Sequence, residues 1–215
     1  MCTKIPRYKD AAEAAATWTI GEILGREKTI PGLYFGDAGI VWFLLRLSQI
    51  CGEPRYRNTA IELARKLTQV SQLSDLVHGA AGQGLMHLAL ALVTNERDSW
   101  KAACAAGDFL IKVATSGTRG SIWPFPESAP SGFAGKSFYG FAHGNAGIGY
   151  FLLKLAQYTR DERYLQSGEY AAKELLAVAQ PTLSNGRGLN WAKDTKDGTL
   201  LPYWCSGASG IGTFF

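Results

Sequence analysis

The feature that most constrains the fold is a motif, Gly-x-x-Gly, that returns four times along the chain. Its first glycines are Gly36, Gly79, Gly144 and Gly207. Two copies stay similar beyond the motif, because Phe43 and Phe151 each follow the second glycine by four residues and begin the same pattern, Phe-Leu-Leu-basic-Leu. Repetition of one supersecondary unit indicates an architecture in which neighbouring units stack and bury a common core.

Each repeat predicts a pair of helices. The stretches 40–50, 85–93 and 148–158 are apolar on nearly every side, which predicts helices that are buried between neighbours. A turn and an amphipathic stretch follow, as in 56–70, where apolar residues recur at helical spacing. Buried inner helices wrapped by half-buried outer ones form a double ring. We therefore predict an all-α fold, an α/α toroid. Residues 8–24 would be its first outer helix, and three hairpins and the start of a fourth would follow.

Composition and charge exclude several classes of partner. The chain has 215 residues, of which 47% are hydrophobic and 19% charged, which is enough for one core, so we expect a single domain over residues 1–215. The net charge of +4 is spread without a basic block, which argues against nucleic acid. No apolar run reaches the roughly 18 residues that a membrane span needs, and residues 1–16 lack the core of a secretory signal. We expect a cytoplasmic protein.

Two connections, 116–142 and 180–204, are too long for simple turns. Loops beyond about 12–15 residues usually carry function or local structure. The two also resemble each other, since the sequence RGSIW at 119–123 is echoed by RGLNW at 187–191. We predict short β-hairpins in both, near the mouth of the ring, and the second contains two candidate turns, Asn185-Gly186 and Asp197-Gly198.

The residue before the first glycine differs among the repeats: it is Phe35, His78, His143 or Ser206. His143 would lie at the start of an inner helix, beside the central cavity, and histidine is the side chain best suited to proton transfer near neutral pH. Helix N-termini converging on that cavity would favour negative charge there. We interpret His78 and His87 as structural.

Two more residues near the motifs are candidates for chemistry. Cys205 is either a metal ligand or an inert thiol, and Asp75 is either an acidic partner or a cap of its turn. One cysteine and two motif histidines do not make a zinc site, because catalytic zinc generally needs three protein ligands. From the residues alone, close packing of the backbone accounts for the motif glycines without any role in chemistry.

Four segments together carry a resemblance to a known family. They are GLYFGDAG at 32–39, Asp75 with HGAAG at 78–82, AHGNAGIG at 142–149 and WCSG at 204–207. In this order they resemble the lanthionine synthetase C-like (LanC-like) family, and the start is similar to the cyclase domains of kinase-fused lanthipeptide synthetases. The resemblance implies a toroid of seven hairpins, of which this chain would hold about half. It also implies addition of a peptide cysteine thiol to dehydroalanine or dehydrobutyrine, which closes a thioether ring.

The resemblance assigns roles to individual residues. Cys205 matches the first ligand of a zinc ion that turns the substrate thiol into a thiolate. His143 matches the group that protonates the resulting enolate, and Asp75 matches a supporting acid. The expected partners are a dehydrated precursor peptide and the kinase and lyase domains of the same synthetase. Aromatic residues of the mouth would bind the peptide, namely Trp123, Tyr139 and Trp204.

The chain also departs from the family pattern. The Cys-His-Gly segment that supplies two more zinc ligands does not occur up to Phe215, so we expect an incomplete zinc site and a domain truncated on its C-terminal side. Leu201 and Ser206 stand where family cyclases often carry arginine and tyrosine or histidine. A non-catalytic LanC-like module that binds a peptide or partner is therefore one alternative. Another is a glycoside hydrolase toroid that uses Asp37 and Asp75 as its carboxylates.

Overall fold

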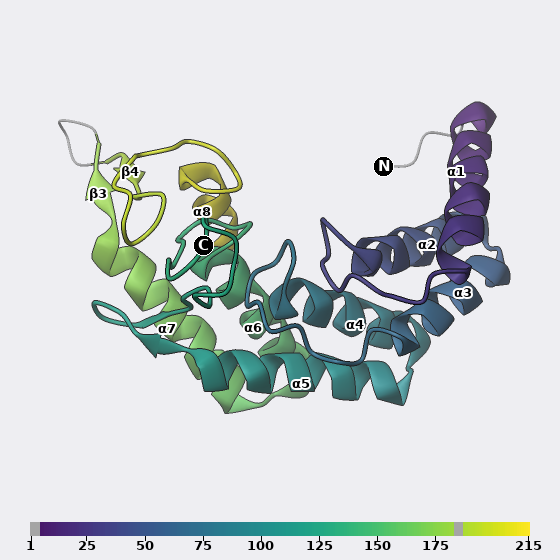
Figure 1. The fold of residues 1–215 in the computed structure, drawn as a ribbon, viewed down its shortest axis with the longest axis horizontal. Helices are drawn as coiled ribbons and strands as arrows, with labels where there is room; N and C mark the ends of the chain where they lie inside the picture. Colours follow the sequence, from purple (N-terminus) through teal and green to yellow (C-terminus); the bar gives the residue numbers. More distant parts are fainter. Residues whose placement is uncertain (1–4, 183–186) are drawn as a thin grey trace.

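The computed structural model describes residues 5–182 and 187–215, and most of them are helical. The helices are α1 (Pro6–Leu24), α2 (Asp37–Cys51), α3 (Pro54–Arg65), α4 (Ala80–Thr94), α5 (Arg97–Val113), α6 (Asn145–Thr159), α7 (Glu162–Val178) and α8 (Ala208–Phe214). Figure 1 shows them arranged as an open arc, with α1 and α8 at its two ends. None of the helices in the described part is long and apolar enough to cross a membrane.

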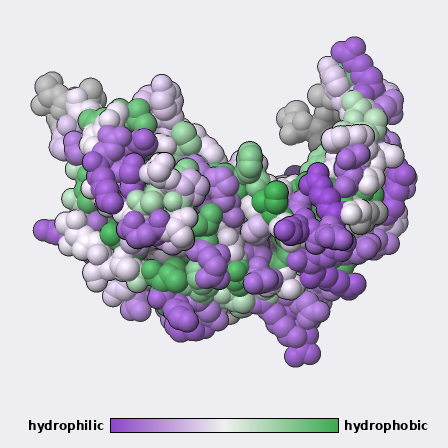
Figure 2. Space-filling model, in the orientation of Figure 1, coloured by the Kyte–Doolittle hydropathy of each residue, from purple (hydrophilic) through white to green (hydrophobic). Residues whose placement is uncertain are grey.

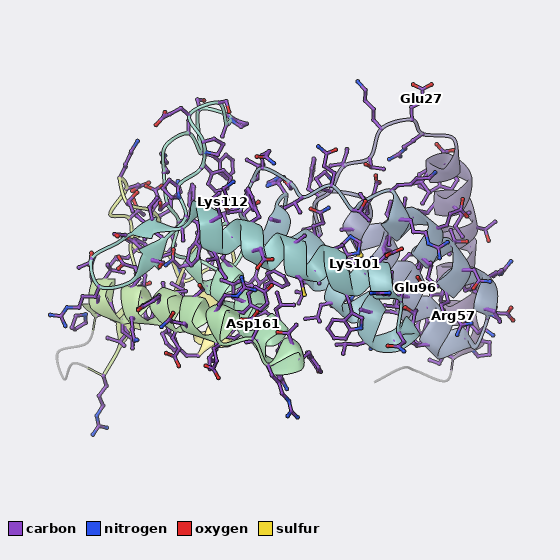
Figure 3. All side chains as sticks on the ribbon, turned by 90° about the horizontal axis from the view of Figure 1, so that it is seen from below. Glu27, Arg57, Glu96, Lys101, Lys112 and Asp161 are labelled. Atoms are coloured by element: carbon purple, nitrogen blue, oxygen red, sulfur yellow. The ribbon has the colours of Figure 1, made fainter. Side chains whose placement is uncertain are left out.

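The predicted alternation of inner and outer helices is confirmed. α2, α4, α6 and α8 follow one another along the inside of the arc, and α3, α5 and α7 cover its outside (Figure 1). α4 packs against its own partner α5 and against both inner neighbours, α2 and α6. The convex side carries exposed charges such as Arg57, Lys101 and Lys112 (Figure 3). The arc therefore consists of stacked helical hairpins.

The core lies between the inner and outer helices and has two parts that share α4. Met86 and Leu90 face the part formed with α1, α2 and α3, whereas Leu88 faces the part formed with α5, α6 and α7. All three side chains are buried. Burying a leucine or methionine contributes about 1.5–3 kcal/mol, so the all-round apolar character of 85–93 has a direct structural cause.

The glycines of the motif have a steric purpose that recurs in every repeat. A Cβ atom on Gly144 would meet the Phe138 carbonyl oxygen, and one on Gly147 would meet the Phe141 carbonyl oxygen, in each case six residues earlier. The other repeats show the same relation. The loop before each inner helix thus folds back against the first turn of that helix, and only glycine leaves room for it.

This close approach caps the inner helices. The amide of Asn145, the first residue of α6, donates to the Phe138 carbonyl at 3.0 Å, and the equivalent amide of Ala80 donates to Leu73 at 2.8 Å. The equivalent bonds from Asp37 and Ala208 are 2.7 and 3.1 Å. Amides at helix starts otherwise lack partners. The loop before each inner helix therefore satisfies the first amide of that helix.

Short antiparallel hairpins occur in both long connections, as predicted. β1 (Thr115–Ser116) pairs with β2 (Ser121–Ile122), and β3 (Gln180–Pro181) pairs with β4 (Leu189–Asn190). The predicted turn at Asn185-Gly186 lies outside the described residues. Each hairpin is anchored by a buried tryptophan, since the indole N–H of Trp123 donates to Leu110 at 2.8 Å and that of Trp191 donates to Leu175 at 2.6 Å. The sequence similarity between the two connections therefore reflects the same structure, a short hairpin anchored by a buried tryptophan.

Candidate functional site

The four loops that precede the inner helices follow one another along the arc, and we call them the motif loops: residues 30–36, 73–79, 138–144 and 201–207. Backbone hydrogen bonds join them in series. The Val77 carbonyl accepts from Tyr34 at 3.2 Å and from Phe35 at 3.3 Å. The Ala142 carbonyl accepts from Val77 at 3.3 Å, and the Cys205 carbonyl accepts from Ala142 at 3.1 Å. Each loop is thus held against the next.

This arrangement brings three of the residues that precede the first glycines, Phe35, His78 and His143, into one row. The rings of Phe35 and His78 lie 5.7 Å apart, and those of His78 and His143 lie 5.5 Å apart and nearly parallel, with 16° between their planes. Phe133, from the long connection before α6, lies against His143 with 5.1 Å between ring centres. The row is therefore covered on one side by aromatic rings.

Asp75 is the centre of the site. Its side chain has no exposed surface, and its Oδ2 lies 2.7 Å from Nδ1 of His143 and 3.1 Å from Nδ1 of His78. Its other oxygen, Oδ1, accepts from the backbone amide of His78 at 3.2 Å. Both interpretations of Asp75 from the sequence therefore apply, because one oxygen caps the turn and the other holds two imidazoles.

The hydrogen bonds to Asp75 determine which nitrogen of each imidazole can act. A carboxylate oxygen only accepts, so Nδ1 of His143 and Nδ1 of His78 carry the hydrogens. Nε2 then remains as the nitrogen that can exchange a proton with a substrate. His143 keeps 19% and His78 33% of its side chain exposed, so both are within reach of a bound molecule.

Asp75, His78 and His143 offer one ligand atom each within 4.8 Å of one another, so the group could hold a metal ion. Its geometry is that of a hydrogen-bonded group, however. Zinc lies about 2.0–2.2 Å from nitrogen and oxygen ligands, whereas here both Nδ1 atoms point at one oxygen at hydrogen-bond distance. A metal ion is not required to explain why these three side chains meet.

Cys205 lies on the last motif loop, where its backbone carbonyl is bonded to the residue before His143. Its side chain is exposed, and its sulfur lies 3.6 Å from the hydroxyl of Ser206. In the part of the chain that the structure describes, Cys205 belongs to no group of three potential metal ligands. Around the Cys205 sulfur, the described residues offer one of the three protein ligands that catalytic zinc generally needs, so they do not form a zinc site there on their own.

The three aromatic residues expected at the mouth lie in different places. Trp123 and Tyr139 belong to the core, with 2% and 7% exposure, and burial raises the pKa of the Tyr139 hydroxyl. Trp204 instead contacts Tyr34 and Phe141, with ring centres 5.4 and 5.3 Å apart. Of the three, Trp204 is the one whose side chain is exposed.

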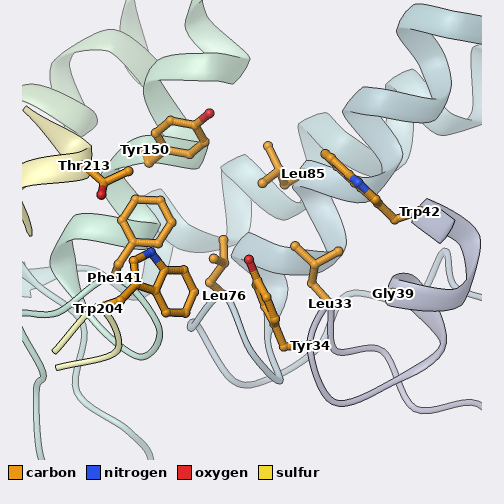
Figure 4. Close-up of a pocket in the computed structure, with 10 residues that line it drawn as sticks. All are labelled: Leu33, Tyr34, Gly39, Trp42, Leu76, Leu85, Phe141, Tyr150, Trp204 and Thr213. Carbon is orange, nitrogen blue, oxygen red and sulfur yellow. The ribbon is translucent and has the colours of Figure 1, made fainter. Parts of the chain in front are cut away.

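Trp204 also lines a pocket of about 470 Å³ on the inside of the arc (Figure 4). Its lining follows the repeat. One set of lining residues stands three positions before the first glycine of each repeat: Leu33, Leu76, Phe141 and Trp204. A second set stands six positions after it, on the inner helices: Trp42, Leu85, Tyr150 and Thr213. Equivalent positions of all four repeats face this space, so it lies on the axis of the arc, in the hollow visible in Figure 2. We call it the axial pocket.

Sequence reasoning missed two parts of the site. It set His78 aside as structural, although His78 shares Asp75 with His143. The signal was available, because His78 and His143 hold the same position in successive repeats, and stacked repeats place such positions side by side. It also missed the axial pocket, whose lining residues look like ordinary core residues in the sequence.

Fold and site together define part of an α/α toroid (Figure 1) in which a buried acid on the motif loops holds two histidines. A family model for lanthionine synthetase C-like proteins matches residues 2–215, so the chain belongs to that family. Among the curated proteins, none matches the chain.

Proposed function

We propose that this chain acts in thioether ring formation, by Michael-type addition of a peptide cysteine thiol to dehydroalanine or dehydrobutyrine. The observation that carries the proposal is the 2.7 Å contact between Asp75 and His143. Family membership supports the substrate class, a dehydrated precursor peptide. The reaction needs a group that exchanges one proton at the place where the new bond forms, and His143 can be that group.

The proposed steps conserve atoms and charge. The thiol passes its proton to Nε2 of His143, the sulfur attacks the β-carbon of the dehydro residue, and the π electrons move to give an enolate. Nε2 of His143 then donates that proton to the α-carbon, which returns the imidazole to its neutral form. Asp75 keeps Nδ1 protonated and stabilises the imidazolium that exists between the two proton transfers.

Zinc is expected from the family, where it would activate the substrate thiol, and Cys205 is our candidate for one ligand. The described residues lack a second and third ligand around that sulfur, so none of the steps above depends on the metal. We extend the proposal to one domain over residues 1–215, to a cytoplasmic location, and to kinase and lyase domains of the same synthetase as partners.

The test is ring closure on a peptide with one cysteine and one dehydroalanine. Because the addition does not change the mass, free thiols are alkylated at intervals and counted by mass spectrometry, with zinc present and with chelator. We expect thiol loss above the buffer rate, and we expect it to fall about 10²–10⁴-fold in His143→Gln. His87→Gln, which changes a buried histidine of α4 outside the Asp75 group, is the control.

Peptide binding without catalysis is the second candidate function. Among the described residues, the exposed Cys205 has no further ligands beside it and cannot hold catalytic zinc with these residues alone, which favours this candidate. In that case the peptide would bind wild type and His143→Gln equally well, and neither protein would accelerate thiol loss under any metal condition.

A further inference from the structure

The axial pocket has a chemical character distinct from that of the histidine site. Its lining includes no Asp, Glu, Lys, Arg or His side chain. Aromatic rings run along one side in contact with one another, since Tyr34, Trp204, Phe141 and Tyr150 lie 5.3–5.4 Å apart in succession. Placing a charged group in such a space is unfavourable, whereas an apolar group gains from leaving water.

The pocket's size favours a side chain as its occupant. A volume of about 470 Å³ lies within the roughly 300–1,000 Å³ that is typical of small-ligand sites. It can admit one aromatic or large aliphatic side chain with some backbone, and it is too small for a helix of another protein. Aromatic walls suit such an occupant, because paired rings add to the gain from burial.

The chain also fixes how far the pocket lies from the proton-transfer group. Leu76 directly follows Asp75, and Phe141 precedes His143 by two residues. Two residues span at most about 7 Å of backbone, so the pocket wall at Phe141 and the imidazole of His143 belong to one short segment. One substrate peptide can therefore place one residue in the pocket and a near sequence neighbour at His143.

We propose that the axial pocket binds a large apolar or aromatic side chain of the substrate peptide, close in sequence to the reacting residue. This inference rests on the proposed function for the identity of the peptide, but not for the preference itself. The pocket would then determine which dehydro residue or cysteine is presented to His143, by holding its apolar neighbour.

Binding is measured with peptides that cannot react, so that the result does not depend on catalysis. Four peptides carry serine in place of cysteine and alanine in place of dehydroalanine, and they differ only in a neighbouring residue: Phe, Leu, Asp or Lys. Titration calorimetry gives their affinities. We expect the Phe and Leu peptides to bind at least about tenfold more tightly than the Asp and Lys peptides.

A variant that fills the axial pocket tests whether the preference for apolar peptides arises there. Thr213 lines the pocket, is exposed, and bonds the Ser209 carbonyl at 3.0 Å. Thr213→Trp fills the space without removing a core side chain and should abolish the preference. Thr17→Trp is the matched control, because Thr17 is also exposed and also bonds the carbonyl four residues earlier, but on α1.

Equal affinities for the four peptides in wild type would overturn the inference. So would a preference that survives Thr213→Trp, because the side chain would then bind elsewhere. Light scattering tests whether a second copy of the chain occupies the pocket instead. If Thr213→Trp changes the oligomeric state and the four peptides bind alike, the pocket is a contact between two copies. If the Phe peptide binds more tightly but the protein closes no ring, the assignment of the pocket to an apolar side chain stands and only the proposed reaction is refuted.

Discussion

The carboxylate of Asp75 and the imidazole of His143 meet at 2.7 Å, although 68 residues separate them in the sequence. They come from the second and third motif loops, so their contact depends on how two neighbouring repeats stack. Asp75 is fully buried, and removing one partner of such a pair leaves the other in a poorly solvated place. The pair therefore links the stacking of the repeats to the proposed chemistry.

Asp75→Asn should impair ring closure more than it impairs folding. The amide keeps the shape of the side chain and one oxygen for the turn, but it loses the charge that stabilises a protonated His143. We expect the rate of thiol loss to fall about 100-fold while the helical circular dichroism signal stays unchanged. An unaltered rate in a folded Asp75→Asn protein would remove Asp75 from the mechanism.

His78→Gln should reduce ring closure less than His143→Gln does. The Nδ1 of His78 lies farther from Asp75, at 3.1 Å, and its ring supports that of His143 by stacking. Loss of a positioning group costs up to about 10²-fold, whereas loss of the proton donor costs up to about 10⁴-fold. Rates are compared for both single variants and the double variant. A His78→Gln rate below that of His143→Gln would exchange the two roles.

Gly144→Ala should destabilise the chain by about 1–3 kcal/mol, because the new methyl group would collide with the Phe138 carbonyl. Gly21→Ala serves as the control. Gly21 lies within α1, and a Cβ atom there would meet no atom within 4 Å. Alanine at this position should therefore raise the free energy of unfolding by about 0.5–1 kcal/mol through its higher helix propensity. Urea unfolding of both variants measures the difference. Similar effects in the two would contradict the steric account of the motif.

His87 should make stability depend on pH. It is buried, its Nε2 bonds the Leu67 carbonyl at 3.0 Å and its Nδ1 has no partner, and burial lowers its pKa. The unfolded chain then takes up the proton more readily than the folded one. Stability is therefore complete above the unfolded value of about 6.5 and falls as the pH drops toward the folded pKa.

The matching variant is His87→Phe, which removes the titrating group while the Leu67 carbonyl keeps a hydrogen bond from Gln83. Urea unfolding at pH 7.5, 6.5 and 5.5 should show a smaller loss of stability in this variant, by up to about 1.4 kcal/mol per pH unit. Parallel curves for wild type and variant would mean that His87 does not titrate in this range.

The fold could be predicted from the sequence because its determinants are periodic. Glycine pairs fix where each inner helix starts, and all-round apolar stretches such as 85–93 can only be buried on two sides. The caps were not predictable from composition. The amide of Asn145 finds the Phe138 carbonyl only because the loop folds back, a path that is set by backbone geometry and not by a recognisable capping side chain.

The candidate site was predicted less completely, for a physical reason. Asp75 and His143 could be named from motif positions, but the sharing of one carboxylate by two imidazoles depends on the spacing between stacked repeats. The fate of the tryptophans also depends on tertiary context, since Trp123 fills the core while Trp204 lines the pocket. Residue type alone does not distinguish the two.

The backbone hydrogen bonds between motif loops have a consequence for how such a site can change. They use carbonyls and amides at Val77, Ala142 and Cys205, so the placement of the residue before each first glycine does not depend on which side chain stands there. The motif loops therefore offer four equivalent backbone positions, which are occupied by Phe35, His78, His143 and Ser206. A single substitution can therefore introduce a new functional group at one of these positions, while the backbone at the other three stays in place.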